Sequence, residues 1–200
     1  TYLNAAEDNA DGTIVVTTSG AEDGQTVTVT GMGVTDTCSL SSDTCTVTVA
    51  AADLQALTDG TTYTITVNVD DVAENSATPD TGDTFVYDIT APSISDVVPS
   101  WGTYLNAAED NADGTIVVTT ADSANGATVT VTGMGVTDTC TVSSNACTVT
   151  VAAADLQSLT DGTTYTINVA LTADAAGNTA TSDTGDTFVY DITAPSISDV

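Results

Sequence analysis

The stretch Thr62–Val69 reads TYTITVNV, in which apolar Tyr, Ile and Val residues alternate with Thr and Asn. Side chains of a β-strand point alternately to opposite faces, so this stretch predicts a strand with one face in a core and the other in water. Shorter versions, TVTVT and TVTV, occur at Thr26–Thr30 and Thr46–Val49. Because Val and Thr also favour strands, the sequence predicts an all-β protein built from antiparallel sheets.

Further strands are predicted before, between and after these three, at Thr13–Thr18, Gly33–Leu40, Thr84–Ile89 and Ser93–Val98. The one helical candidate is the run AAADLQAL that starts at Ala50, which is long enough for a single turn between strands. About seven short strands in about 100 residues, separated by turn residues, are typical of an immunoglobulin-like β-sandwich.

The chain contains this pattern twice. TYLNAAEDNADGTIVVTT, at Thr1–Thr18, recurs without a change at Thr103–Thr120, and roughly four in five positions match over the whole repeat. A period of about 100 residues suits a string of whole domains rather than a solenoid. We therefore expect two tandem immunoglobulin-like β-sandwich domains arranged end to end, with repeat 1 at 1–97, repeat 2 at 103–200 and a linker at about 92–102. The final SISDV matches the start of that linker, so we expect the two repeats to come from a longer array.

The charge excludes several classes of function. The 200 residues include 28 Asp and Glu and no Lys, Arg or His, which gives a formal net charge of −28. Nucleic-acid binding depends on Lys and Arg, so we expect none. No apolar run reaches the ~20 residues of a membrane helix, so we expect no direct membrane insertion. Catalysis would have to use a carboxylate pair or a metal-bound water, and nothing in the sequence singles out such a pair, so we expect no enzyme.

Each repeat holds two cysteines with six residues between them, Cys38 and Cys45 in the first and Cys140 and Cys147 in the second. A zinc ribbon needs two closely spaced cysteine pairs, and the chain has no His to complete a mixed site. If the strands that carry these cysteines form a hairpin, the two thiols of a repeat face each other. A disulfide within each repeat is therefore predicted, with four buried free thiols as the alternative. Disulfides persist in oxidising, extracellular settings.

Three stretches resemble a known family: AADLQALTDGTTYTITVNV, AEDGQTVTV and, in the second copy, DAAGNTATSDTGDTFVYDITAPSI. They resemble the tandem bacterial immunoglobulin-like repeats that form the extender regions of giant extracellular surface adhesins, including the RTX type. The resemblance covers both repeats. It implies a β-sandwich without enzymatic activity at the bacterial cell surface, with calcium at or near the domain junctions. Glu74 stands where the second copy has Gly177, so we expect the loop geometry there to differ.

The acidic loops are the candidate calcium sites. EDNADG, at Glu7–Gly12 and Glu109–Gly114, places oxygen ligands at alternate positions before a Gly but lacks the distal Glu of an EF-hand. We expect it to supply half of a site at the joint between the repeats, with solvated loops as the alternative. The candidate ligands are Asn4, Glu7, Asp8, Asp11, Asp70, Asp71, Asp88, Asn106, Glu109, Asp110, Asp113, Asp174 and Asp191.

Two nearly identical copies favour a structural role, in which each domain adds a fixed length to an adhesin stalk. The partners would then be neighbouring repeats of the same chain. One alternative is an extracellular filament in which copies pack laterally or head to tail, and another is a module that binds a sugar or a protein. Trp101 is expected to pack at the domain junction, and Tyr63 and Tyr165 to fill the sandwich cores.

Overall fold

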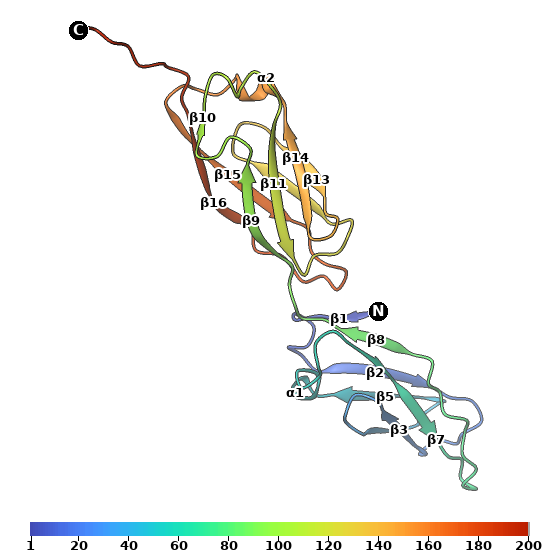
Figure 1. Ribbon diagram of the computed structural model, residues 1–200. Coiled ribbons are helices and arrows are strands. Elements are labelled where there is room, and N and C mark those ends of the chain that lie inside the picture. Colours follow the sequence, from blue (N-terminus) through green and yellow to red (C-terminus); the bar gives the residue numbers. More distant parts are fainter. Residues whose placement is uncertain (200) are drawn as a thin grey trace. The chain divides into compact units, whose positions relative to one another are not determined.

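The computed structural model describes residues 1–199, apart from the side chain of Thr184 (Figure 1). The chain divides into two compact units, unit 1 at Thr1–Thr90 and unit 2 at Ala91–Val200. Both units are built almost entirely of strands, as the alternating pattern predicts, and each has one helical turn, α1 (Ala51–Leu54) or α2 (Ala153–Leu156). None of the described helices is long and apolar enough to cross a membrane.

Unit 2 is a sandwich of two sheets. One sheet has the strand order β10-β16-β15-β12-β13, and the other has the order β14-β11-β9. β10 runs parallel to β16, and the other pairs are antiparallel. This is the arrangement of an immunoglobulin-like domain. The strands are β9 (Ser93–Pro99), β10 (Tyr104–Leu105), β11 (Gly114–Ala121), β12 (Thr128–Thr132), β13 (Asp138–Thr141), β14 (Ala146–Val151), β15 (Thr163–Leu171) and β16 (Asp183–Tyr190).

Unit 1 repeats this plan, with β2 and β8 shorter than their counterparts β11 and β16. Its sheets have the orders β1-β8-β6, β4-β3-β7 and β2-β5, and β1 runs parallel to β8. The predicted strand Thr62–Val69 is present in two parts that meet at Ile65, which together correspond to β15. The strands are β1 (Tyr2–Leu3), β2 (Gly12–Thr17), β3 (Thr26–Thr30), β4 (Asp36–Ser39), β5 (Thr44–Val49), β6 (Thr61–Thr64), β7 (Thr66–Val69) and β8 (Thr84–Tyr87).

The core of each unit follows from the period-2 pattern. In β5 the burial alternates, with Cys45, Val47 and Val49 buried and the three threonines exposed. In β3 the side chains of Val27 and Val29 are completely buried, as are those of their counterparts in β12. Val side chains therefore face inward from both sheets, and Thr side chains cover the outer faces.

The range 92–102, expected to be a linker, contains β9, and β9 pairs with β11. The boundary between the units therefore lies after Thr90, and Ala91 and Pro92 are the residues before β9. Trp101 is not packed at a junction but is 6% exposed inside unit 2, with its ring centroid 5.3 Å from that of Phe188. The apolar side chains of this segment complete the core of the second sandwich.

Both predicted disulfides are present, Cys38–Cys45 in unit 1 and Cys140–Cys147 in unit 2. The strands that carry the cysteines were expected to pair with each other as a hairpin. In the structure they follow each other through a turn, but β4 and β5 belong to different sheets. The turn between β4 and β5 is tight and includes Asp43 at φ 64°. Each disulfide therefore joins the two layers of a sandwich.

Candidate functional site

The loop between β1 and β2, residues 4–11, is held together by its own polar side chains. The amide oxygen of Asn4 accepts hydrogen bonds from the backbone N–H groups two and three residues on, at 2.9 and 3.1 Å. A carboxylate oxygen of Glu7 accepts one from the N–H of Asn4 at 3.1 Å. Asp11 accepts one from the N–H of Ala51, at the start of α1, at 3.0 Å. These side chains cap backbone groups that have no strand partner.

Unit 2 keeps the same contacts in the loop between β10 and β11. Glu109 accepts a hydrogen bond from the N–H of Asn106 at 3.1 Å. Asp113 accepts one from the N–H of Ala153 at 2.9 Å. Equivalent residues therefore hold the loop in the same conformation in both units.

One carboxylate of each loop is buried against a tyrosine. Asp8 is 6% exposed, and its Oδ2 accepts a 2.6 Å hydrogen bond from the hydroxyl of Tyr87. Asp110 and Tyr190 form the same pair at 2.7 Å. Burial and the bond to Asp8 raise the pKa of Tyr87 to about 12. The bond to Asp110 and burial raise the pKa of Tyr190 to about 12. These two candidate calcium ligands therefore anchor the loop to the last strand of its unit.

The buried tyrosines are not the ones that the sequence singled out. Tyr63 and Tyr165 are half-buried, and each hydroxyl accepts a 2.8 Å hydrogen bond from a backbone N–H five residues earlier. Tyr87 is 1% exposed instead. The signal that could have identified it is the spacing of Phe85 and Tyr87, which places both side chains on one face of the last strand.

A second acidic loop, after β7, also closes on itself. The carboxylate of Asp71 accepts hydrogen bonds from the backbone N–H and the side-chain amide of Asn75, both at 2.8 Å. Asp174 makes the same two bonds in unit 2, at 2.8 and 2.9 Å. The bonds from Asn75 lower the pKa of Asp71. Glu74 has φ 64° and its counterpart Gly177 has φ 94°, so both loops have a residue with positive φ at this position. The difference in loop geometry that was expected from this substitution is therefore small.

Within each unit, the expected calcium ligands are divided between the two ends of the sandwich. In unit 1, Asp88 follows the last strand, whereas Asp70 and Asp71 lie at the opposite end of the sandwich, because β6 is antiparallel to β8. In unit 2, residues 106–113 lie at the end remote from Ser93, which is paired with the last residue of β11. Within residues 1–199, no three Asp, Glu, His or Cys side chains form a group that could hold a metal ion. The carboxylates bonded to backbone N–H groups and tyrosines do not fit a preformed calcium site within either unit.

A carboxylate that the sequence analysis did not single out holds the residues that follow the last strand of each unit. Asp59 accepts hydrogen bonds from a backbone N–H at 2.8 Å and from the hydroxyl of Thr90. Asp161 makes the equivalent bonds at 2.9 Å and, to the hydroxyl of Thr193, at 2.6 Å. The threonine hydroxyl is the main cause that lowers the pKa of each carboxyl group. The candidate Asp191 accepts a hydrogen bond from the N–H of Thr193 at 3.2 Å.

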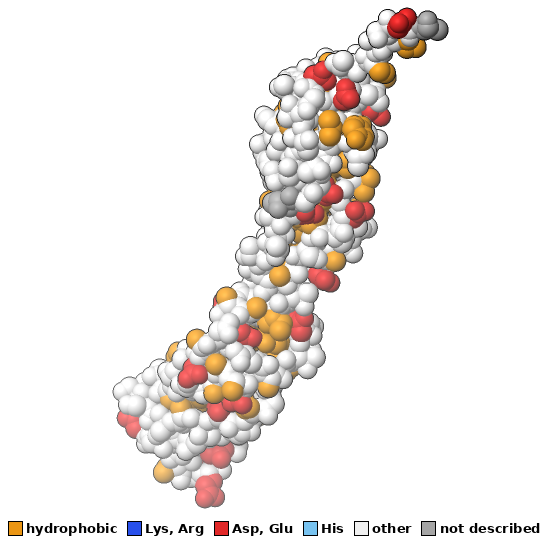
Figure 2. All heavy atoms as spheres, turned by 90° about the vertical axis from the view of Figure 1, so that its left-hand side faces the viewer, with side chains coloured by type: hydrophobic (Ala, Val, Ile, Leu, Met, Phe, Trp, Pro, Cys, Tyr) orange, Lys and Arg blue, Asp and Glu red, His pale blue; other side chains and the backbone are white. Residues whose placement is uncertain are grey.

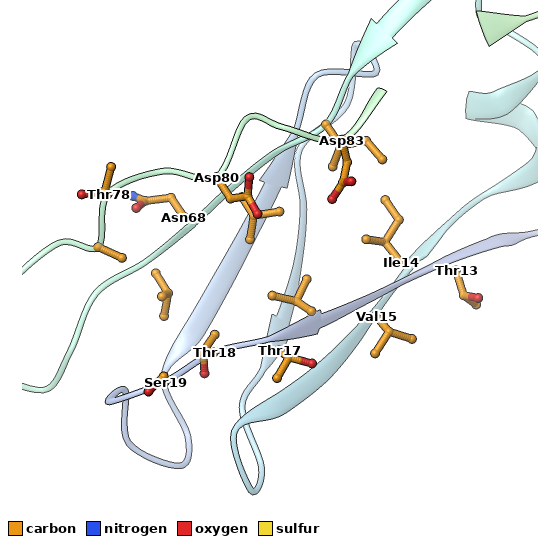
Figure 3. Close-up of a pocket in the computed structure, with 15 residues that line it drawn as sticks. Thr13, Ile14, Val15, Thr17, Thr18, Ser19, Asn68, Thr78, Asp80 and Asp83 are labelled. Carbon is orange, nitrogen blue, oxygen red and sulfur yellow. The ribbon is translucent and has the colours of Figure 1, made fainter. Parts of the chain in front are cut away.

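A groove of about 610 Å³ runs along one edge of β2 (Figure 3). Residues 13–19 form one wall, and the other comprises part of β7 and of the segment 77–83, with Asp80 and Asp83 among its residues. A second hollow, of about 310 Å³, shares Ile14 with the groove and reaches Gly12, Leu54 and Phe85. The groove has a mixed lining of Thr, Val, Ile and Asp, whereas the second hollow is also lined by Leu, Met, Phe and Tyr side chains.

The charged side chains lie scattered over the visible face of each unit rather than in one patch (Figure 2). Because the chain has no Lys, Arg or His, its side chains carry no positive charge that could bind phosphate. The charge of −28 must be balanced by cations from solution.

Comparison with known proteins gives a context for the fold. No protein-family model and no curated protein matches the chain. A structure from a 1.5-MDa bacterial ice-binding adhesin, described for its retention at the host cell surface, aligns over 96% of this chain at 25% identity with a TM-score of 0.57. A Ca²⁺-stabilized adhesin that helps an Antarctic bacterium bind ice aligns over 96% at 29% identity with a TM-score of 0.54.

The chain spans 61% of the first of these structures and 46% of the second. A bacterial immunoglobulin-like domain from the M. primoryensis ice-binding adhesin aligns with 50% of this chain and 95% of its own length, at 31% identity and a TM-score of 0.37. In sequence and fold the two repeats are thus similar to domains of large bacterial surface adhesins.

Proposed function

We propose that this chain, a pair of tandem immunoglobulin-like repeats similar to domains of large bacterial adhesins, is an extender segment. It spaces a distal binding region from the surface of the cell. The observation that carries the proposal is the recurrence of an identical loop and strand, Thr1–Thr18 and Thr103–Thr120, in two units of one fold. A spacer needs the same unit repeated, whereas a binding or catalytic site needs one particular arrangement of side chains.

An extracellular location at the bacterial surface is part of the proposal. The two adhesins aligned over 96% of the chain support it, because both are described as bacterial adhesins. The disulfide in each unit also supports it, because such bonds persist in oxidising compartments. In this function the partners are the neighbouring repeats of the same chain.

Calcium binding is the second part of the proposal. One similar structure is described as Ca²⁺-stabilized, and this chain has 28 carboxylates without a basic side chain. Since neither unit holds a preformed ligand set among the described residues, we propose that calcium acts by bridging carboxylates that do not meet in its absence. Extracellular calcium modules bind at about 10⁻⁴ to 10⁻³ M, so the ion would be bound only outside the cell.

Small-angle X-ray scattering of the 200-residue chain tests both parts. A spacer with its repeats end to end gives a large maximum dimension, whereas two repeats packed side by side give a compact profile that would contradict the proposed function. Calcium at several millimolar should narrow the distance distribution, and chelator should broaden it. Magnesium at the same ionic strength is the control. Identical profiles in calcium and in chelator would contradict the role of calcium, but they would not contradict the spacer function.

A further inference from the structure

An edge strand of unit 2 carries an aspartate on its inner face. β13 lies at one edge of the larger sheet and pairs with β12 alone among the described strands. In this pairing Asp138 lies opposite Val131, which is completely buried. Paired residues of neighbouring strands point to the same face of a sheet. The side chain of Asp138 therefore points toward the interior of the sandwich and not away from it.

Unit 1 has the same arrangement at the equivalent edge. β4 is the edge strand of its sheet, and Asp36 lies opposite the completely buried Val29. In both Asp36 and Asp138, one carboxylate oxygen, Oδ2, is buried and has no hydrogen-bond partner among the described residues. The two residues as a whole are only partly buried. A buried oxygen without a donor costs free energy, so its presence in both units needs a physical reason.

The other edge of the larger sheet in unit 2 also carries inward-facing aspartates. β10 pairs only with the last two residues of β16, so the earlier part of β16 has an open side among the described strands. On that part Asp186 is paired with Ile167, which is 1% exposed. Asp183 is paired in the same way with Val169. Burial raises the pKa of Asp186, and the nearby carboxylates of Asp183 and Asp96 raise it further.

A strand that docked on either edge would cover these carboxylates. The backbone N–H and C=O groups of an edge strand can pair with a strand of another molecule, and inward-pointing charges are one means by which natural sheets prevent this. A docked strand would close the side from which water reaches the carboxylate. The chain has no Lys, Arg or His that could replace this water. Docking would therefore bury a charge without compensation.

Near-identical repeats make such pairing a particular hazard. The strand TVTVT occurs at Thr26–Thr30 and again at Thr128–Thr132, so the two units contain interchangeable strands. Units joined by a short segment also have an effective concentration toward each other on the order of millimolar. Misassembly between repeats is a characteristic failure of proteins with this organisation. The edges of each sheet therefore need protection against strands of other repeats.

We propose that the inward-facing aspartates of β4, β13 and β16 keep these edges unpaired, so that repeats of the same chain and of neighbouring chains do not join strand to strand. The short length of β4 and β13, four residues each, acts in the same direction. This inference goes beyond the spacer function and does not rest on it, because the hazard exists for any array of interchangeable strands. It disfavours lateral packing of copies through these edges.

Sedimentation equilibrium of the 200-residue chain in about 0.5 M NaCl, which screens general repulsion, tests the proposal. The unchanged chain should keep its monomer mass of 20.0 kDa. Asp138→Val should strengthen self-association about tenfold or more, because a docked strand then covers an apolar side chain. Asp138→Glu retains the inward charge and should stay monomeric. Thr139→Val is the matched control, because it adds a valine to the exposed face of the same strand and leaves the aspartate in place.

Asp36→Val makes the same test independently in unit 1, should Asp138→Val fail to fold. Trp101 fluorescence reports the fold of unit 2, and far-ultraviolet circular dichroism reports the strands of both units. Hydrogen exchange of the associated Asp138→Val variant should show added protection in β13. Folded valine variants that remain monomeric would overturn the proposal. So would equal association of Thr139→Val, or association without added protection in β13, because the contact would then not depend on the guarded edge.

Discussion

The paired aspartate and tyrosine in each unit join the acidic loop to the core. Tyr190 is 2% exposed, and its hydroxyl donates a hydrogen bond to Asp110, which is 6% exposed. A carboxylate at such a site needs a donor, because burying it without one costs more than an ordinary hydrogen bond contributes. The acidic loop is therefore held by a polar contact in the interior.

Replacement of that hydroxyl should destabilise its unit. We expect Tyr190→Phe to lower the free energy of unfolding of unit 2 by about 1 to 3 kcal/mol, because the buried side chain of Asp110 loses its hydrogen-bond donor. The single Trp of the chain, Trp101, lies in the core of unit 2 and reports this transition in a urea titration followed by fluorescence. Tyr104→Phe, at a tyrosine that is 62% exposed, is the control. Equal midpoints for the two variants would contradict the prediction.

The same pairs predict a loss of stability in alkali. The pKa of Tyr87 and of Tyr190 is raised from 10.0 to about 12, so the folded state holds the phenol proton more tightly than the unfolded chain. This stabilisation is present in full below pH 10 and is lost as the pH rises toward 12, by on the order of 2 kcal/mol for each tyrosine. Absorbance of tyrosinate should show two of the six tyrosines ionising last, together with unfolding. If all six ionise together near pH 10 in the folded protein, the prediction fails.

At the scale of elements, the disulfides connect the two sheets of each sandwich. Each closes a loop of eight residues, which contributes about 2.5 kcal/mol by restricting the unfolded chain. We expect the double variant Cys140→Ala and Cys147→Ala to lower the stability of unit 2, read from Trp101, by about this amount. The matched variant Cys38→Ala and Cys45→Ala should leave the Trp101 transition unchanged, because its disulfide belongs to unit 1. The reverse result, or no effect from either variant, would contradict the assignment.

Sequence analysis could predict the elements because the strands follow strict alternation. TVTVT and its neighbours could be assigned as strands from their alternation, and the disulfides could be predicted from an expected hairpin that places the two cysteines of a repeat face to face. It could not predict that Ser93–Pro99 belongs to unit 2, because a strand sequence does not say which domain it completes. Nor could it predict the use of Asp11 and Asp71, because a carboxylate that caps backbone N–H groups looks the same in sequence as a metal ligand. Calcium was expected from the charge density and from the family resemblance, and neither gives a distance between side chains.

For the whole molecule, repulsion among the carboxylates should lower the free energy of unfolding of both units. A net charge of −28 without any basic side chain favours the expanded, unfolded chain, and salt screens this repulsion over a Debye length of about 10 Å at 0.1 M. We expect the thermal midpoint of both units to rise by several degrees between about 20 mM and about 500 mM NaCl. Tetramethylammonium chloride should act like NaCl, because screening does not depend on the identity of a monovalent cation. A midpoint that is constant in both salts would show that the carboxylates are too well solvated to repel.

The parallel pairing of β1 and β8, the first and last strands of unit 1, has a consequence when the chain is pulled. Tyr2 and Leu3 of β1 lie beside Val86 and Tyr87 of β8 in the same direction. Tension applied to the two ends of unit 1 draws these strands past each other, so their hydrogen bonds bear load together instead of opening one after another. Unit 1 is thus arranged to resist tension between its ends, which is the load that the proposed spacer function would place on it.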